Sequence, residues 1–296
     1  MKKTILSVLA FLLLFPSVAM AQLTVVATLP TLGAVARAIG GDDVKVETLA
    51  TPTEDPHFVD PRPDYVLKLS RADLLVYNGM ELEIGWLPAL QKNARNTKVL
   101  DNASGAFDAS RYIKPIDVPT TKVDRSQGDI HAQGNPHYIY ALPEIVQVAT
   151  ALADKMAKLD PEHESNYKQR LESFKTTAKT KDAAYKQRFA ALGNTKILTY
   201  HESMGYLNQW LKLNQVGTIE PKPGVAPSPS HVAQLVSSLK STQLLAIVQE
   251  TYQPRATSDK MAKMLGTRVI TIEPGPKDSE DYFVYLDRLV GAFFTN

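Results

Sequence analysis

Two histidines and three glutamates stand next to segments that are predicted as strands, and a third histidine lies in the loop that leads to the long helix; together they could bind a metal ion. His57 lies in the loop after one strand segment, His201 directly follows another, and His137 precedes a long helical segment. The glutamates close the three later strand segments: Glu220, Glu250 and Glu273. Imidazole nitrogen suits Zn²⁺, Ni²⁺, Cu²⁺ and Fe²⁺, whereas all-oxygen sites suit Mg²⁺ and Ca²⁺. These residue types therefore predict a transition-metal site, provided that the fold brings them together.

The order of the predicted elements shows how the fold could bring these residues together. Strand segments are predicted at 23–29, 44–49, 72–77 and 98–100, and again at 196–200, 216–219, 244–248 and 268–272, with helical segments between them. Strands that alternate with helices predict parallel α/β sheets, which bind ligands beyond the carboxyl ends of their strands. If the two sheets face each other with these ends inward, the histidines and an acid converge in one cleft.

One long helix separates the two halves of the chain. It is predicted to begin at Asp160-Pro161-Glu162, which provides an N-cap, a proline at the first position and an acidic first turn, and it stops at Gly193. At ~1.5 Å per residue it is roughly 48 Å long, more than the ~30 Å of a small domain. We therefore predict two α/β lobes, each around a four-stranded sheet, joined by a rigid helix: a signal peptide at 1–21, an N-terminal lobe at 22–160, the connecting helix at 161–192 and a C-terminal lobe at 193–296.

The first residues predict export from the cytoplasm. Lys2 and Lys3 precede an apolar run at 5–15, and Ala19-Met20-Ala21 is a small-x-small cleavage site. The sequence has no cysteine, so neither a disulfide nor a lipid on an N-terminal cysteine is expected. Cleavage after Ala21 removes the positive charges of Lys2 and Lys3, which changes the formal net charge from +2 to zero. A periplasmic protein without a charge-driven attraction to nucleic acid is expected.

Several ordered motifs resemble a known family. They are Asp55-Pro56-His57, Asp60-Pro61-Arg62-Pro63, Asn78-Gly79, Asn135-Pro136-His137, the run His201–Tyr206 (HESMGY) and the run Val269–Pro274 (VITIEP). Together they are similar to the motifs of the zinc- and manganese-specific periplasmic binding proteins of ABC transporters, the ZnuA-type group. The resemblance covers essentially the whole chain after the signal peptide.

The resemblance implies a site and a function. His57, His137 and His201 would be metal ligands and Glu273 the fourth, at a position where the family usually has aspartate. Three histidines and one carboxylate favour Zn²⁺ over Mn²⁺ or Fe²⁺. Glu250 would be the usual acid at a strand end, where it could orient a ligand histidine. The implied protein is a monomeric receptor, not an enzyme, that delivers the ion to a membrane ABC permease, and His131 is interpreted as a surface residue of a polar loop.

Three alternatives stay open at this point. A zinc hydrolase would keep one coordination position free for water, with Glu202 or Glu250 as general base. A receptor for an organic ligand would need an aromatic-lined cleft, and the chain has only two tryptophans, Trp86 and Trp210. An adhesin-like protein would be expected to carry an anchor.

Overall fold

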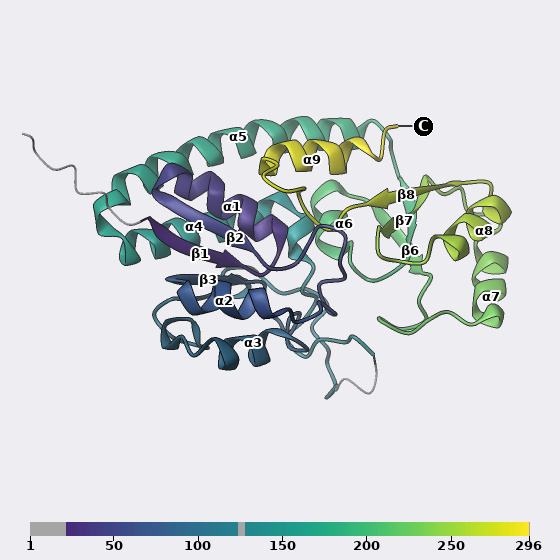
Figure 1. Ribbon diagram of the computed structural model, residues 1–296. Helices are drawn as coiled ribbons and strands as arrows, with labels where there is room; N and C mark the ends of the chain where they lie inside the picture. The colour runs from purple at the N-terminus through teal and green to yellow at the C-terminus, as the bar shows by residue number, and fades with distance from the viewer. Residues whose placement is uncertain (1–21, 124–127, 296) are drawn as a thin grey trace, which may run out of the picture.

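The computed structural model describes residues 22–123 and 128–295, so the predicted signal peptide lies outside the described residues. Two four-stranded parallel sheets form the framework, with strand orders β2-β1-β3-β4 and β6-β5-β7-β8 (Figure 1). The strands are β1 Leu23–Ala27, β2 Val44–Thr48, β3 Leu74–Tyr77, β4 Ala106–Asp108, β5 Lys196–Thr199, β6 Asn214–Thr218, β7 Ala246–Glu250 and β8 Arg268–Ile272. The predicted fold class, two α/β lobes with one sheet each, is confirmed.

The fourth strand of the first sheet was expected in the wrong place. The segment 98–100 overlaps a 3₁₀ turn, Thr97–Val99, in which the Asn96 side chain accepts a hydrogen bond from the Lys98 amide. The strand that pairs with β3 is β4, which begins directly after Gly105. Only glycine fits there, because a Cβ would lie 2.3 Å from the Asp73 carbonyl oxygen. Glycine therefore lets the backbone come close to the Asp73 carbonyl just before the chain pairs with β3.

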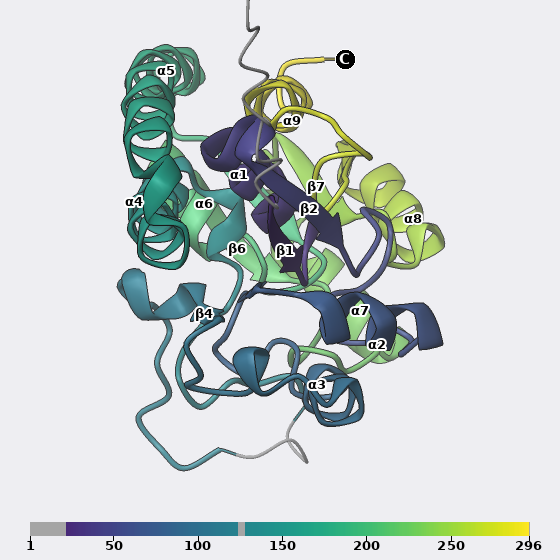
Figure 2. The same ribbon diagram turned by 60° about the vertical axis from the view of Figure 1, so that its left-hand side comes forward.

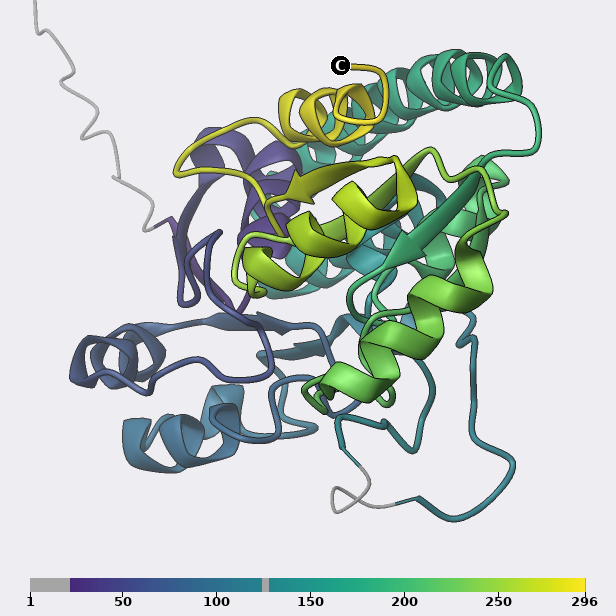
Figure 3. The ribbon, with the colours of Figure 1, turned by 90° about the vertical axis from the view of Figure 1, so that its right-hand side faces the viewer.

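Nine α-helices are assigned within 22–123 and 128–295. They are α1 Pro30–Gly40, α2 Pro63–Arg71, α3 Leu87–Ala94, α4 Leu142–Leu159, α5 Glu164–Ala190, α6 Gly205–Leu211, α7 Pro229–Leu239, α8 Arg255–Leu265 and α9 Tyr282–Gly291. In the described part of the chain, none has both the length and the apolar character that a membrane crossing requires. Figure 3 shows α7 and α8 over the outer side of the second sheet, where they cover a small apolar cluster.

Helix α5 spans both lobes, as the sequence predicted, and polar bonds attach it at both ends (Figure 1). Near its start, Arg170 donates hydrogen bonds of 2.7 Å to the Gly40 carbonyl and to Asp43. Near its end, Tyr185 donates to Asp287 of α9 at 2.6 Å, and the Asp182 carboxylate accepts from the Trp210 indole at 2.6 Å. Both lobes are therefore fastened to one rigid element.

The apolar core is continuous between the lobes. One cluster of buried side chains includes strand residues of the first sheet, such as Val25 and Leu75, and of the second, such as Val248 and Ile272. Figure 2 shows α4 beside α5 and α9 close to α1, which brings the C-terminal helix against the first lobe. The division at 160 and 193 stays a prediction, because no gap in the core marks it.

The bond between α5 and α6 gives a measurable contribution to stability. We expect Trp210→Phe to lower the free energy of unfolding by about 1–2 kcal/mol, because it removes a hydrogen bond from a buried indole to a carboxylate, and phenylalanine has no donor to replace it. Lys186→Ala is the matched control: it removes the other partner of Asp182, an exposed one, and should cost less than ~0.5 kcal/mol. Urea unfolding of both variants measures the difference, and equal losses would contradict the role given to the indole.

Candidate metal centre

Three histidines that are far apart in sequence converge between the sheets. One possible ligand atom from each of His57, His137 and His201 lies within 4.8 Å of the others, and all three side chains are buried. Their ring centres are 5.2 Å, 5.5 Å and 5.1 Å apart. An ion held ~2 Å from three imidazole nitrogens at tetrahedral angles would set the ring centres ~5 Å apart. The spacing of the rings therefore fits a shared cation.

Two of the histidines are held by the same local device, an Asx-Pro-His turn. In one turn, Asp55 Oδ1 accepts from the His57 amide at 2.9 Å and lies 2.8 Å from its Nδ1. In the other, Asn135 Oδ1 accepts from the His137 amide at 3.0 Å and lies 2.8 Å from its Nδ1. The side chain two residues earlier thus fixes both the backbone and the ring, and it leaves Nε2 of each ring to face the site.

The proline carbonyl of each turn is fixed as well. The Trp86 indole donates to the Pro56 carbonyl at 3.0 Å, and the Asn78 amide donates to the Pro136 carbonyl at 2.9 Å. Both donors come from the segment after β3, so a single part of the first lobe holds both turns. These contacts restrict the rotation of the histidines before any ion arrives.

The third histidine depends on an acid from a neighbouring strand. His201 follows β5, and its Nδ1 lies 2.7 Å from Glu220 Oε2, just beyond β6. The same oxygen accepts from the Gly224 amide at 2.9 Å. Each of the three rings therefore has an oxygen partner at Nδ1, the arrangement by which proteins orient histidines that bind metals through Nε2.

The rings differ in how readily they take up a proton. Burial, together with the neighbouring imidazoles of His201 and His57, holds the pKa of His137 well below its usual value. Burial also opposes a charge on His201, but the hydrogen bond and negative charge of Glu220 outweigh it and raise the pKa of His201. His137 is thus ready to accept a metal ion at neutral pH, whereas His201 must more often lose a proton first.

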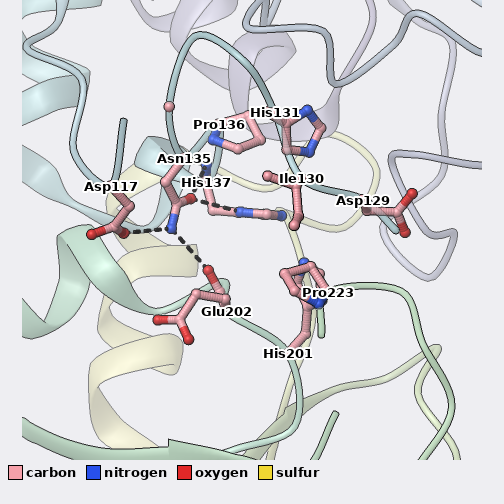
Figure 4. Close-up of a pocket in the computed structure, with 11 residues that line it drawn as sticks. Asp117, Asp129, Ile130, His131, Asn135, Pro136, His137, His201, Glu202 and Pro223 are labelled. Atoms are coloured by element: carbon pink, nitrogen blue, oxygen red, sulfur yellow. Dashed lines mark hydrogen bonds between the residues drawn. The ribbon is translucent and has the colours of Figure 1, made fainter. Parts of the chain in front are cut away.

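Nε2 of both His57 and His137 is buried and meets no hydrogen-bond partner among the described residues. A buried nitrogen acceptor without a partner is costly unless something binds to it. Figure 4 shows part of this region, a cavity of about 80 Å³ in which the His137 ring lies between His131 and His201. A cation bound between the rings would satisfy both nitrogens at once.

The structure does not bring Glu273 into this group. Within the described ranges, the converging ligand atoms are those of the three histidines. The Glu273 carboxylate accepts a hydrogen bond from Arg288 of α9 and lies 3.7 Å from Lys277. Glu250, at the end of β7, is fully buried, and burial raises the pKa of its carboxyl group. One Glu250 oxygen lies 3.4 Å from the Tyr140 hydroxyl.

Comparison with known proteins shows the family of this chain. Residues 25–293 match the family described as "ZnuA: Zinc-uptake complex component A periplasmic". The chain belongs to this family. It is 25% identical over 272 residues to a putative metal-binding protein of Treponema pallidum, covering 89% of this chain and 83% of that protein. It is 26% identical over 235 residues to the manganese ABC transporter substrate-binding lipoprotein scaA of Streptococcus gordonii, covering 77% and 72%.

A solved structure, described as the crystal structure of ZnuA, has the same fold. It superposes with a TM-score of 0.77 at 24% identity, over 92% of this chain and all of that one. Membership of the family makes this chain an extracytoplasmic solute-binding protein for the uptake of a divalent metal ion through an ABC transporter. Proteins of this family are not enzymes, so the hydrolase alternative is set aside.

The two Asx-Pro-His motifs were recognised in the sequence, but the role of Asp55 and Asn135 in holding the histidine rings was not predicted. The signal was present, since both motifs place an oxygen acceptor two residues before the histidine. His131 was interpreted as a surface residue, and this was wrong. It is 9% exposed, and its ring is stacked on that of His57 with the centres 5.3 Å apart.

Proposed function

We propose that this protein captures Zn²⁺ through His57, His137 and His201 and delivers it to a membrane ABC permease. The observation that carries the proposal is the convergence of three buried imidazoles, each oriented by an oxygen acceptor at Nδ1. A site rich in imidazole suits Zn²⁺, whereas Mn²⁺ prefers carboxylate and water oxygens. The family description also names zinc, although the scaA relative is named for manganese.

Charge balance supports a divalent cation at this place. The three imidazoles are neutral when they bind a metal ion, so the ion brings a charge of +2 into a buried site. Asp55 and Glu220 lie directly behind His57 and His201 and offer two carboxylates. Attraction from these two groups offsets much of the cost of removing the ion from water.

The assignment of Glu273 as the fourth ligand stays a prediction. To bind the ion, the Glu273 carboxylate would have to break its ion pair with Arg288 of α9. Cleavage after Ala21 and a monomeric state are likewise proposed on sequence grounds alone. The continuous core and the two-ended attachment of α5 favour small shifts of the lobes on binding rather than wide opening about a hinge.

Metal uptake in cells tests the choice of metal, because affinity measured in vitro follows the Irving–Williams order and favours Zn²⁺ over Mn²⁺ and Fe²⁺ in many sites. We expect deletion of the gene to lower zinc accumulation in zinc-limited medium. The wild-type gene should restore it, and a gene with alanine at the three histidines should not. Loss of manganese or iron accumulation with normal zinc would contradict the assignment of zinc.

A further inference from the structure

A fourth imidazole lies against the histidine triad. The ring centre of His131 is 5.3 Å from that of His57, within the range of the triad's own spacings, and 6.4 Å from that of His137. The His131 side chain is buried, although it comes from a loop without regular structure. Figure 4 shows it on the opposite side of the His137 ring from His201, at the wall of the cavity that leads to both.

The backbone around His131 is fixed by both lobes. On one side, the Asp129 amide donates to the Pro223 carbonyl at 2.9 Å, which attaches the loop to the second lobe. On the other side, the Ala132 amide donates to Glu81 Oε2 at 3.1 Å, and the Asn135 amide donates to the Ile116 carbonyl at 2.9 Å. The loop therefore bridges the lobes over the site and presents His131 at a defined place.

A glycine in this loop shows how close the packing is. Gly134 has a φ of +109°, and a Cβ there would lie 2.7 Å from the Ile116 carbonyl oxygen. A side chain at this position would push the loop away from the first lobe. The path of the chain between His131 and the Asn135-Pro136-His137 turn therefore requires glycine, and it keeps the two imidazoles near each other.

We propose that His131 supplies the fourth donor, so that the ion is held by four imidazoles. This inference rests on the proposed function and adds the ligand that completes its site. The ligand atoms of His131 lie outside the 4.8 Å grouping of the other three histidines, so the His131 ring has to move toward the ion to complete a tetrahedral shell. The two carboxylates behind His57 and His201 already offset the charge of the ion, so a neutral fourth ligand is electrostatically sufficient. Glu273 is meanwhile bound to Arg288.

A shell of four imidazoles has a consequence for selectivity. It contains no oxygen donor, so it discriminates against Mn²⁺ more strongly than three histidines with a carboxylate would. His131 would bind the ion from the loop that bonds to both lobes, whereas His201 binds it from the end of β5. Release to a permease would then begin with movement of the loop rather than of a whole lobe.

Counting the imidazoles around a bound ion tests the proposal. X-ray absorption spectroscopy of the Zn²⁺-loaded full chain is expected to give four imidazole ligands for the wild type and three for His131→Ala. Long-range ¹H–¹⁵N spectra of the wild type should show four metal-bound Nε2 atoms, one of them from His131. In a competition titration, His131→Ala should bind Zn²⁺ about 10- to 100-fold more weakly.

His231→Ala is the matched control, since His231 lies in the first turn of α7 with its amide capped by Ser228, away from the triad. Three imidazoles in the wild type, with the affinity of His131→Ala unchanged, would overturn the proposal while leaving the proposed function intact. The same holds if Glu273→Gln weakens binding and His131→Ala does not. If the wild type binds no divalent ion at all, both the inference and the proposed function fail. The wild-type ligand count remains decisive even if His131→Ala folds poorly.

Discussion

Replacing His137 with alanine is expected to abolish tight binding of Zn²⁺. The ring is buried, its Nδ1 is held by Asn135, and its low pKa keeps it neutral, so it is the triad member that is most ready to bind a metal ion. Losing a ligand should cost more than the ~100-fold in affinity that loss of an outer hydrogen-bond partner costs. Competition with a chromophoric chelator measures this directly.

The same variant should lose the thermal stabilisation that Zn²⁺ gives. A ligand present at ~1,000 times its dissociation constant stabilises the folded state by about 4 kcal/mol, so the wild-type melting temperature should rise clearly when the ion is added. The rise should vanish for His137→Ala and persist for the control His231→Ala. A His137→Ala protein that folds and still binds with wild-type affinity would exclude His137 as a ligand.

Affinity for Zn²⁺ is expected to fall as the pH is lowered, with the decline set by His201. Glu220 raises the pKa of His201, so its ring begins to take up a proton above the usual pKa of ~6.5, and a protonated ring cannot bind the ion. Below that pKa, protonation of the His201 ring alone should lower the affinity about tenfold per pH unit, because this ring must release its proton before it binds the ion. The low pKa of His137 means that this ring does not add to the loss until the pH is much lower.

Glu220→Gln separates the two effects of the carboxylate. At pH 8 the variant should bind Zn²⁺ about 10- to 100-fold more weakly, because the ring loses the partner that orients it. Without the Glu220 carboxylate, burial is opposed only by the charges of Glu250 and Asp55, so the pKa of His201 falls relative to the wild type. The decline in affinity with pH then starts at a lower pH, and the gap from the wild type narrows as the pH falls. Glu172→Gln, on the exposed face of α5, is the control. A gap that widens toward low pH would contradict the role given to Glu220.

Most of the framework could be read from local patterns. Seven of the eight strands lie where apolar runs predicted them, and α5 begins after Asp160-Pro161 and ends shortly before Gly193, as the capping residues indicated. The exception is β4, which is only three residues long. A strand that short has no periodicity to detect, and its position depends on where Gly105 lets the chain approach β3.

The bonding partners of the three glutamates at the strand ends could not be predicted from local patterns. Glu220, Glu250 and Glu273 each close a strand or follow one, so their positions alone do not distinguish them, and Glu273 was chosen as the ligand from the family resemblance. In the structure, Glu220 bonds to His201, Glu250 is buried near Tyr140, and Glu273 forms an ion pair with Arg288. Their partners come from other strands and helices, and the position of a partner depends on packing between elements rather than on neighbours in sequence.

The sequence by itself determined most of the elements and the turns that hold His57 and His137, because hydrophobic period, capping residues and the Asx-Pro-His turns all act over a few residues. Only the tertiary structure decided which side chains lie together. It placed Glu220 beside His201 and Arg288 beside Glu273, and it buried His131. These depend on contacts between different elements, whose partners are 15 to 51 residues apart for the bonds Arg288–Glu273, His201–Glu220 and Ala132–Glu81. His131 looks exposed in its own polar loop, and it is buried because bonds to Pro223 in one lobe and Glu81 in the other hold that loop across the site.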